Sequence, residues 1–118
     1  ASLGAWFGRP GAKVVGMMGD GSFNFTCGEL ETVVRCNAPI TYVVFSNANF
    51  GWIKASQRDD CGKRYYNVDF NRTNHAAVAE AFGVKTWRVE RPEDLDQAIK
   101  EAFEQVAQVM VVSGGGAM

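Results

Sequence analysis

The stretch that decides the fold is Val14-Val15-Gly16-Met17-Met18-Gly19-Asp20-Gly21-Ser22, in which an apolar run stops at a glycine-rich turn. A second apolar run, Tyr42-Val43-Val44-Phe45-Ser46, stops in a similar way at Asn47-Ala48-Asn49. In open α/β sheets, ligands bind outside the carboxyl ends of the strands, and a glycine-rich turn entering a helix offers its N–H groups to phosphate oxygens. We therefore predict that these two strands bring a carboxylate, an amide and backbone donors to one point.

The residue types at this point suit a magnesium ion that holds a diphosphate. Mg²⁺ takes about six oxygen ligands and usually only one or two carboxylates, together with substrate phosphates. Asp20 can supply one anionic oxygen, Asn47 a neutral one, and a backbone carbonyl near Asn49 a third. Close backbone approach and a hydroxyl donor are available from Gly19, Gly21 and Ser22. Taken alone, Gly-Asp-Gly is also an ordinary turn, so the interpretation depends on the spacing of the two motifs.

That spacing resembles the signature of thiamine-diphosphate (ThDP) enzymes, in which Gly-Asp-Gly is followed by about 25 residues and then Asn. Here residues 22–46 separate Gly21 from Asn47. The resemblance covers roughly residues 10–107. It continues through Ser22-Phe23, Glu29-Leu30-Glu31-Thr32, Ala38-Pro39-Ile40, Phe50-Gly51-Trp52-Ile53-Lys54, His75-Ala76 and Ala81-Phe82-Gly83-Val84. Together these segments are similar to the C-terminal, diphosphate-binding domain of the acetolactate synthase and benzoylformate decarboxylase group, and to its acetolactate synthase-like branch in particular.

Two positions depart from the family pattern. Members commonly carry Asn-Asn where this chain has Ser46-Asn47, and matched residue by residue Asn47 takes the metal-ligand position. The last predicted strand, residues 109–112, runs into Ser113-Gly114-Gly115-Gly116-Ala117-Met118 instead of further apolar and acidic residues. We therefore expect that end to be truncated or altered.

The resemblance implies ThDP and Mg²⁺ as cofactors. It implies metal ligands Asp20, Asn47 and Asn49, and cofactor contacts from these three together with Gly19, Gly21, Ser22 and Gly51. It also implies decarboxylation or carboligation of 2-oxo acids through the C2 carbanion of the cofactor. In such enzymes the glutamate that activates the aminopyrimidine comes from a complementary pyrimidine-binding domain, usually of a neighbouring subunit, and no residue here matches it. We assign no catalytic residue and expect the chain by itself to be inactive.

Two other functions remain open. One is a non-catalytic α/β interaction or binding module that kept the fold, which would show no metal-dependent binding of ThDP. The other is a detached subunit of a split ThDP-dependent 2-oxo acid oxidoreductase, which neighbouring genes for the missing domains would favour. Residues 1–118 read as one domain, either a fragment of a larger enzyme or a stand-alone cassette.

The composition fits a small globular domain. The chain has 118 residues, 47% of them apolar, and a net charge of −1, so no basic excess suggests nucleic acid. No apolar run approaches the roughly 18 residues needed to span a membrane, and no signal pattern or P-loop is present. Three cysteines without Cys-x-x-Cys spacing favour a reducing, cytoplasmic setting.

Apolar periodicity predicts strands that alternate with helices, and hence a doubly wound, mainly parallel α/β sheet with helices on both faces. The predicted strands are residues 13–18, 40–45, 85–90 and 109–112. Helices are predicted to begin at a capping box over Thr26–Glu29, at Thr73 or Asn74, and at Arg91-Pro92, with a helix end over residues 1–7. Residues 57–73 have no sustained period and are expected to form a long loop.

The remaining polar candidates have simpler explanations. His75 at a helix start is expected to be structural or capping, Glu29 to be the partner in the capping box, and Glu31 to be solvated.

The aromatic residues of the central segment are expected at an interface. The side chains of Trp52, Tyr65 and Tyr66 could line a substrate channel or pack against a partner domain, and packing in a core or at an interface is the simpler explanation. We expect an apolar surface around Phe50, Trp52, Ile53 and Tyr65 to pair with a second copy in a two-fold homodimer.

Overall fold

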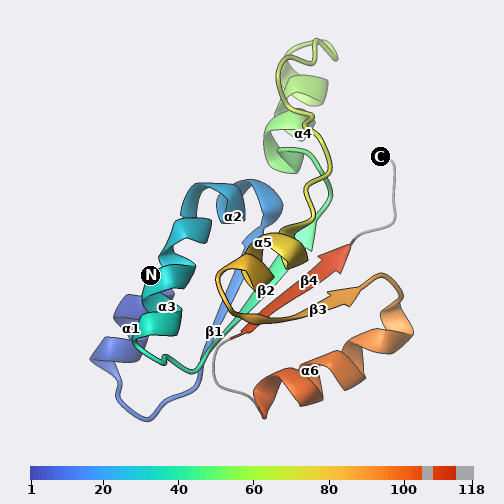
Figure 1. Ribbon diagram of the computed structural model, residues 1–118. Helices are drawn as coiled ribbons and strands as arrows, with labels where there is room; N and C mark the ends of the chain where they lie inside the picture. Colours follow the sequence, from blue (N-terminus) through green and yellow to red (C-terminus); the bar gives the residue numbers. More distant parts are fainter. Residues whose placement is uncertain (105–107, 114–118) are drawn as a thin grey trace.

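Four parallel strands form a single sheet in the computed structural model, which describes residues 1–104 and 108–113 (Figure 1). The strands are β1 (Val14–Gly19), β2 (Ile40–Ser46), β3 (Lys85–Val89) and β4 (Gln108–Ser113). Their spatial order is β1-β2-β4-β3, and β1 pairs with β2 from Val14 opposite Ile40 to Gly19 opposite Phe45. The two strands that carry the glycine-rich and asparagine motifs are therefore neighbours that end at the same edge.

Helices connect the strands. They are α1 (Ser2–Gly8), α2 (Asp20–Thr26), α3 (Leu30–Arg35), α4 (Gly51–Asp60), α5 (His75–Ala81) and α6 (Leu95–Phe103), with short 3-10 turns η1 (Cys27–Glu29) and η2 (Pro92–Asp94). The predicted doubly wound α/β fold is confirmed. None of the helices in the described ranges is long and apolar enough to cross a membrane.

The main core lies between the sheet and helices α1, α2, α3 and α5. Alternate residues of β2, namely Ile40, Tyr42 and Val44, face this side and pack with Phe23 of α2 and Val33 of α3. Fully burying one such aliphatic or aromatic side chain stabilises the fold by about 1.5–3 kcal/mol. This packing fixes α2 and α3 on the sheet, and α2 begins at the carboxyl end of β1.

The opposite face of the sheet is covered by α6 over β3 and β4 only. A smaller core joins Val89 of β3 to Ala98 and Ala102 of α6. Over β1 and β2 this face leaves apolar side chains exposed, with Met17 69% and Phe45 46% accessible. Within the described residues, one half of the second face therefore has no helix above it.

Two sequence predictions about local structure are wrong. Thr26–Glu29 forms no capping box, because the Thr26 hydroxyl donates to the Ser22 carbonyl (3.0 Å) inside α2, which begins six residues earlier than the predicted helix start. The predicted loop over residues 57–73 is wrong for residues 57–60, where α4 continues to Asp60, and holds for residues 61–73, which form no helix or strand. α4 buries none of its residues and projects from the body of the molecule (Figure 1), so it has no apolar period for the sequence to reveal.

The other predicted helix ends are confirmed. The Asn74 side chain caps α5 by accepting from the Ala77 N–H (3.1 Å). Gly83 has φ of +83° just after α5, where its N–H bonds the Glu80 carbonyl and the Val84 N–H bonds the Ala79 carbonyl. Pro92 opens the turn that leads into α6. The cysteines Cys27, Cys36 and Cys61 are all free.

Candidate functional site

A cleft of about 560 Å³ lies at the carboxyl ends of β1 and β2. It is lined by all seven residues predicted for cofactor contact: Gly19, Asp20, Gly21, Ser22, Asn47, Asn49 and Gly51. Its remaining lining is aromatic and aliphatic: Phe25, Phe45, Phe50, Trp52 and Ile53. The fold thus brings two motifs far apart in the sequence to one site, as the parallel pairing of β1 and β2 requires.

Asp20 is the first residue of α2 and is only 2% exposed. Its Oδ2 accepts from the N–H groups of Asn47 (2.9 Å) and Ala48 (2.7 Å) and from the Ser46 hydroxyl (3.4 Å). Within the described part of the chain, its Oδ1 accepts only from the adjacent Gly21 N–H (2.8 Å). One oxygen therefore locks the turn after β2 against the start of α2, while the other retains capacity for a further ligand.

Ala48 adopts the left-handed conformation, with φ of +57°. This conformation costs an L-residue about 1–2 kcal/mol, and such strain concentrates at functional sites. Here it aims the Ala48 N–H at the Asp20 carboxylate, and this charge-assisted hydrogen bond offsets the cost.

Asn47 and Asn49 brace one another across this left-handed residue. The Asn49 N–H donates to Asn47 Oδ1 (3.3 Å), and Asn49 Nδ2 donates to the Asn47 carbonyl (3.1 Å). An amide oxygen has two lone pairs, so Asn47 Oδ1 can still accept a second partner. The exposed Asn47 side chain is thus held at the cleft with a free oxygen lone pair.

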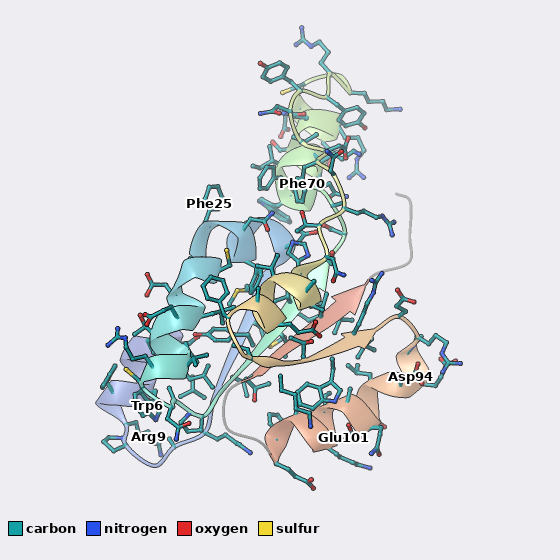
Figure 2. All side chains as sticks on the ribbon, viewed as in Figure 1. Trp6, Arg9, Phe25, Phe70, Asp94 and Glu101 are labelled. Atoms are coloured by element: carbon teal, nitrogen blue, oxygen red, sulfur yellow. The ribbon has the colours of Figure 1, made fainter. Side chains whose placement is uncertain are left out.

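Gly21 has a steric reason to be glycine. A Cβ at this position would lie 2.5 Å from Cε1 of Phe50, whose ring packs in turn on Phe70 with ring centroids 5.1 Å apart. Figure 2 shows Phe70 at the base of the projecting α4. Gly21 therefore lets the start of α2 and the start of α4 meet at the cleft.

These residues fit a magnesium ion and a diphosphate group. The cleft offers one carboxylate oxygen from Asp20 and one amide oxygen from Asn47, which is the sparse, hard-oxygen ligand set that Mg²⁺ takes beside phosphates. Nowhere in residues 1–104 and 108–113 do three or more His, Cys, Asp or Glu side chains gather into a metal site. The donor set therefore favours an ion shared with a phosphate ligand over an ion held by protein alone.

One wall of the cleft is apolar and open to solvent. We call it the apolar wall and define it as Phe25, Phe45, Trp52 and Ile53. Trp52 is 91% exposed and Phe25 84%, and Figure 2 shows Phe25 directed away from the body of the molecule. Phe50, predicted at this surface, is instead partly buried against Phe70.

The other candidates lie outside the cleft. Glu31 forms an exposed ion pair with Arg35 (3.0 Å), as a solvated residue would, and Glu29 is exposed and caps nothing. Tyr66 and Tyr65 are exposed on the segment that follows α4, so they belong to neither core. His75 is buried behind α2.

Three contributors to the site were not predicted from the sequence. In the sequence Ser46 stands out only as a departure from the family pattern, whereas in the structure its hydroxyl donates to Asp20 Oδ2. Ala48 acts through its backbone, and nothing about an alanine side chain signals a left-handed conformation. Phe50 forms part of the cleft under Gly21, a contact between segments that only the fold brings together.

Comparison with known proteins identifies the fold and its family. A family model described as thiamine pyrophosphate enzyme, C-terminal TPP binding domain, matches residues 1–113. The chain is also similar to the thiamine diphosphate-dependent 4-hydroxybenzoylformate decarboxylase of Rhodococcus jostii RHA1. The TM-score is 0.86 at 23% identity, over 94% of this chain and 21% of that one, a likeness that concerns the fold.

Relatives that are similar in sequence narrow the assignment within this family. It is 34% identical over 104 residues to the probable acetolactate synthase large subunit of Methanococcus aeolicus, which covers 87% of this chain and 17% of that protein. It is 34% identical over 110 residues to the acetolactate synthase of Bacillus subtilis, covering 93% and 19%. It is also 34% identical over 116 residues to the 3D-(3,5/4)-trihydroxycyclohexane-1,2-dione hydrolase of Shouchella clausii, covering 93% and 18%.

The chain thus spans less than a fifth of the length of these curated relatives. It belongs to the thiamine pyrophosphate enzyme family as a C-terminal TPP-binding domain of the acetolactate synthase-like branch, and its cofactor is thiamine diphosphate.

Proposed function

We propose that this domain binds the diphosphate of ThDP through Mg²⁺, as part of a 2-oxo acid decarboxylase or carboligase related to acetolactate synthase. The observation that carries the proposal is the buried Asp20 carboxylate, which lines the cleft, is tied by Oδ2 to the turn bearing Asn47 and retains acceptor capacity on Oδ1. Proteins similar to it in sequence include two named as acetolactate synthases.

Each residue of the cleft has a distinct task in this proposal. Asp20 and Asn47 hold the metal through their side-chain oxygens, and the backbone carbonyl of Asn49 adds a neutral ligand. Gly19 and Gly21 let the diphosphate approach the backbone closely, and Ser22 offers its hydroxyl at the start of α2. When bound, ThDP supplies the reactive carbon for cleaving or joining 2-oxo acids, while this chain supplies binding and orientation.

The apolar wall is the surface that we assign to a complementary pyrimidine-binding domain. That domain would also bring the activating glutamate, for which we propose no residue of this chain. Two observations support this occupant: the curated relatives are more than five times longer than the matched region, and the wall borders the proposed cofactor site directly.

Isothermal titration of ThDP into the 118-residue chain, with and without Mg²⁺, tests the proposal. We expect heat of binding that requires Mg²⁺ in the parent. Asp20→Asn keeps the volume of the buried side chain and removes its charge, so it should abolish the metal-dependent heat. Asn47→Ala changes an exposed side chain and should weaken binding by roughly tenfold or more, since it removes one metal ligand.

A matched control is Asn71→Ala, which changes another exposed loop asparagine that does not line the cleft and should bind as the parent does. If Mg²⁺ makes no difference to ThDP binding by the parent, the domain is a non-catalytic binding module and the proposal is wrong. Equal binding by the parent and Asp20→Asn would also contradict it.

A further inference from the structure

His75 is buried at 1% exposure and does not line the cleft. It begins α5, where the preceding Asn74 provides the cap, so its backbone position is fixed. Its ring lies edge-on to Phe23, with ring centroids 5.6 Å apart and planes at 85°. Its Nε2 lies 3.1 Å from Oδ1 of Asn24.

Phe23 and Asn24 both belong to α2, the helix whose first residue is Asp20. One packing contact and one hydrogen bond from a single buried side chain therefore fix α2 in position and in rotation about its axis. Because α2 has only seven residues, a small rotation at Asn24 would move the Asp20 carboxylate by a comparable amount.

The same histidine also borders the turn that binds Asp20. A small hollow of about 40 Å³ is lined by His75 together with the turn residues Ser46, Asn47 and Ala48. The His75 Nδ1 has no hydrogen-bond partner among residues 1–104 and 108–113. A polar hollow of this size has room for one water molecule, and a water there would satisfy Nδ1 and connect it to the turn.

If this position needed only to fill space in the core, an apolar side chain would stabilise the fold more than a histidine does. Leaving a buried polar atom unpaired lowers the stability of the fold, whereas an apolar side chain of similar volume carries no such penalty. The pKa of His75 is lowered by burial, so the ring is held in its neutral form and serves as a hydrogen-bonding group. What the ring gains over an apolar residue is its bond to Asn24 and its reach toward the hollow.

We propose that His75 is a positioning residue of the diphosphate site, which holds α2, and thus the Asp20 carboxylate, in register with the turn at Ser46–Ala48. The inference rests on the proposed function for its effect on affinity, because the cradle it orders is the cradle assigned to Mg²⁺ and diphosphate. Its structural part concerns the ligand-free chain and can be measured without any cofactor.

The experiment compares His75→Leu with His75→Gln. Leucine removes both ring nitrogens at nearly the same volume, whereas glutamine can still donate to Asn24. We expect His75→Leu to weaken Mg²⁺-dependent binding of inorganic diphosphate by about 10- to 100-fold, which is the usual loss when a residue that orients a metal ligand is removed. His75→Gln should restore affinity to within about threefold of the parent. The urea midpoint of His75→Leu should equal or exceed that of the parent, since an unpaired buried group has been removed.

Amide hydrogen exchange supplies the readout that needs no ligand. In His75→Leu, the N–H groups of Asn47 and Ala48 should exchange at least about tenfold faster than in the parent, because their bonds to Asp20 are loosened. The control is Thr41→Val, which removes a buried hydroxyl from β2 outside the cleft and should change neither exchange nor affinity.

The outcomes separate this inference from the proposed function. If the parent binds diphosphate with Mg²⁺ and His75→Leu matches it in affinity and exchange, the role of His75 is overturned and the proposed function stands. If the parent fails to bind but exchange at Asn47 and Ala48 still rises only in His75→Leu, the proposed function fails and the positioning role is supported. Equal losses in His75→Leu and His75→Gln would overturn the role of the bond to Asn24.

Discussion

At the level of single residues, Ala48 carries the backbone strain of the site. Replacing Ala48, whose φ is +57°, by glycine would remove this strain, because glycine adopts the left-handed conformation freely. Glycine also loses more conformational freedom on folding, which offsets part of the gain. We predict that Ala48→Gly leaves the free energy of unfolding unchanged or raises it by up to about 1 kcal/mol. Urea denaturation followed by circular dichroism measures the difference.

The same substitution in an ordinary helix gives the control for Ala48. Ala55 lies within α4, where replacement by glycine should cost about 1 kcal/mol. If Ala48→Gly destabilises the chain as much as Ala55→Gly does, the turn is not held in the left-handed conformation.

His75 gives the folded chain a predictable response to acid. Burial lowers its pKa below the ordinary value of 6.5, and the negative charge of Asp20 opposes that shift only in part. The charged side chains of Arg72 and Arg88 border the same hollow. As the pH falls below about 6.5, the unfolded chain takes up a proton at this residue before the folded chain does. The stability that the neutral His75 ring contributes is therefore fully present above that pH. It decreases as the pH falls from there toward the lower pKa of His75 in the folded chain.

Chemical denaturation at pH 7.5, 6.5 and 5.5 tests this response to acid. One proton contributes at most about 1.4 kcal/mol per pH unit to the slope. His75→Gln should show a shallower decline than the parent between pH 6.5 and 5.5, because the titrating ring is gone. Parallel slopes in the two proteins would show that His75 does not cause the acid sensitivity.

At the level of elements, the stability of α5 depends on the cap at its N-terminus. Asn74 accepts from the Ala77 N–H, and loss of such a cap costs about 1 kcal/mol. We predict that Asn74→Ala lowers the free energy of unfolding by about that amount and that Asn74→Ser restores most of it. The urea midpoint is the measurement, and Asn71→Ala, an exposed loop change, should stay within about 0.5 kcal/mol of the parent. An unchanged midpoint for Asn74→Ala would mean that the cap contributes nothing.

The helices also show which local signals are readable in a sequence. α5 and α6 could be predicted because Asn74, Gly83 and Pro92 mark their ends and buried alanines mark their inner faces. The sequence predicts no helix over α4 (Gly51–Asp60), because none of its residues is buried and its sequence therefore shows no hydrophobic stripe. The sequence around Thr26 predicts a capping box, but the helix begins earlier, at Asp20. Its start is fixed by the end of β1 and by the Asp20 carboxylate, which accepts from the Gly21 N–H.

At the level of the whole molecule, the exposed apolar surfaces predict self-association of the purified chain. The apolar wall and the uncovered face around Met17 leave large side chains in water, and apolar patches of several hundred Å² are uncommon on stable monomers. In the absence of a complementary domain we expect a two-fold dimer, because closed symmetric pairs predominate among homo-oligomers. Sedimentation equilibrium over a wide range of concentration measures it, with the fluorescence of Trp52 expected to change on dilution.

Trp52→Lys places a charge on the apolar wall and should shift the equilibrium toward monomer. Tyr66→Lys is the matched control, because Tyr66 is also a highly exposed aromatic residue but does not line the cleft. A parent that stays monomeric at every concentration would contradict the prediction.

The sequence by itself determined the two motifs, the parallel strands that end in them, and the family, because apolar runs, glycines and a fixed spacing are local properties of the chain. It also indicated the seven cleft residues, since strands paired in parallel must end at one edge. Only the tertiary structure decided how Asp20 is held, that Ala48 is left-handed, that Phe50 lies under Gly21, and that His75 lies behind α2. These depend on contacts between segments distant in the sequence, and such contacts arise only when the sheet and its helices pack together.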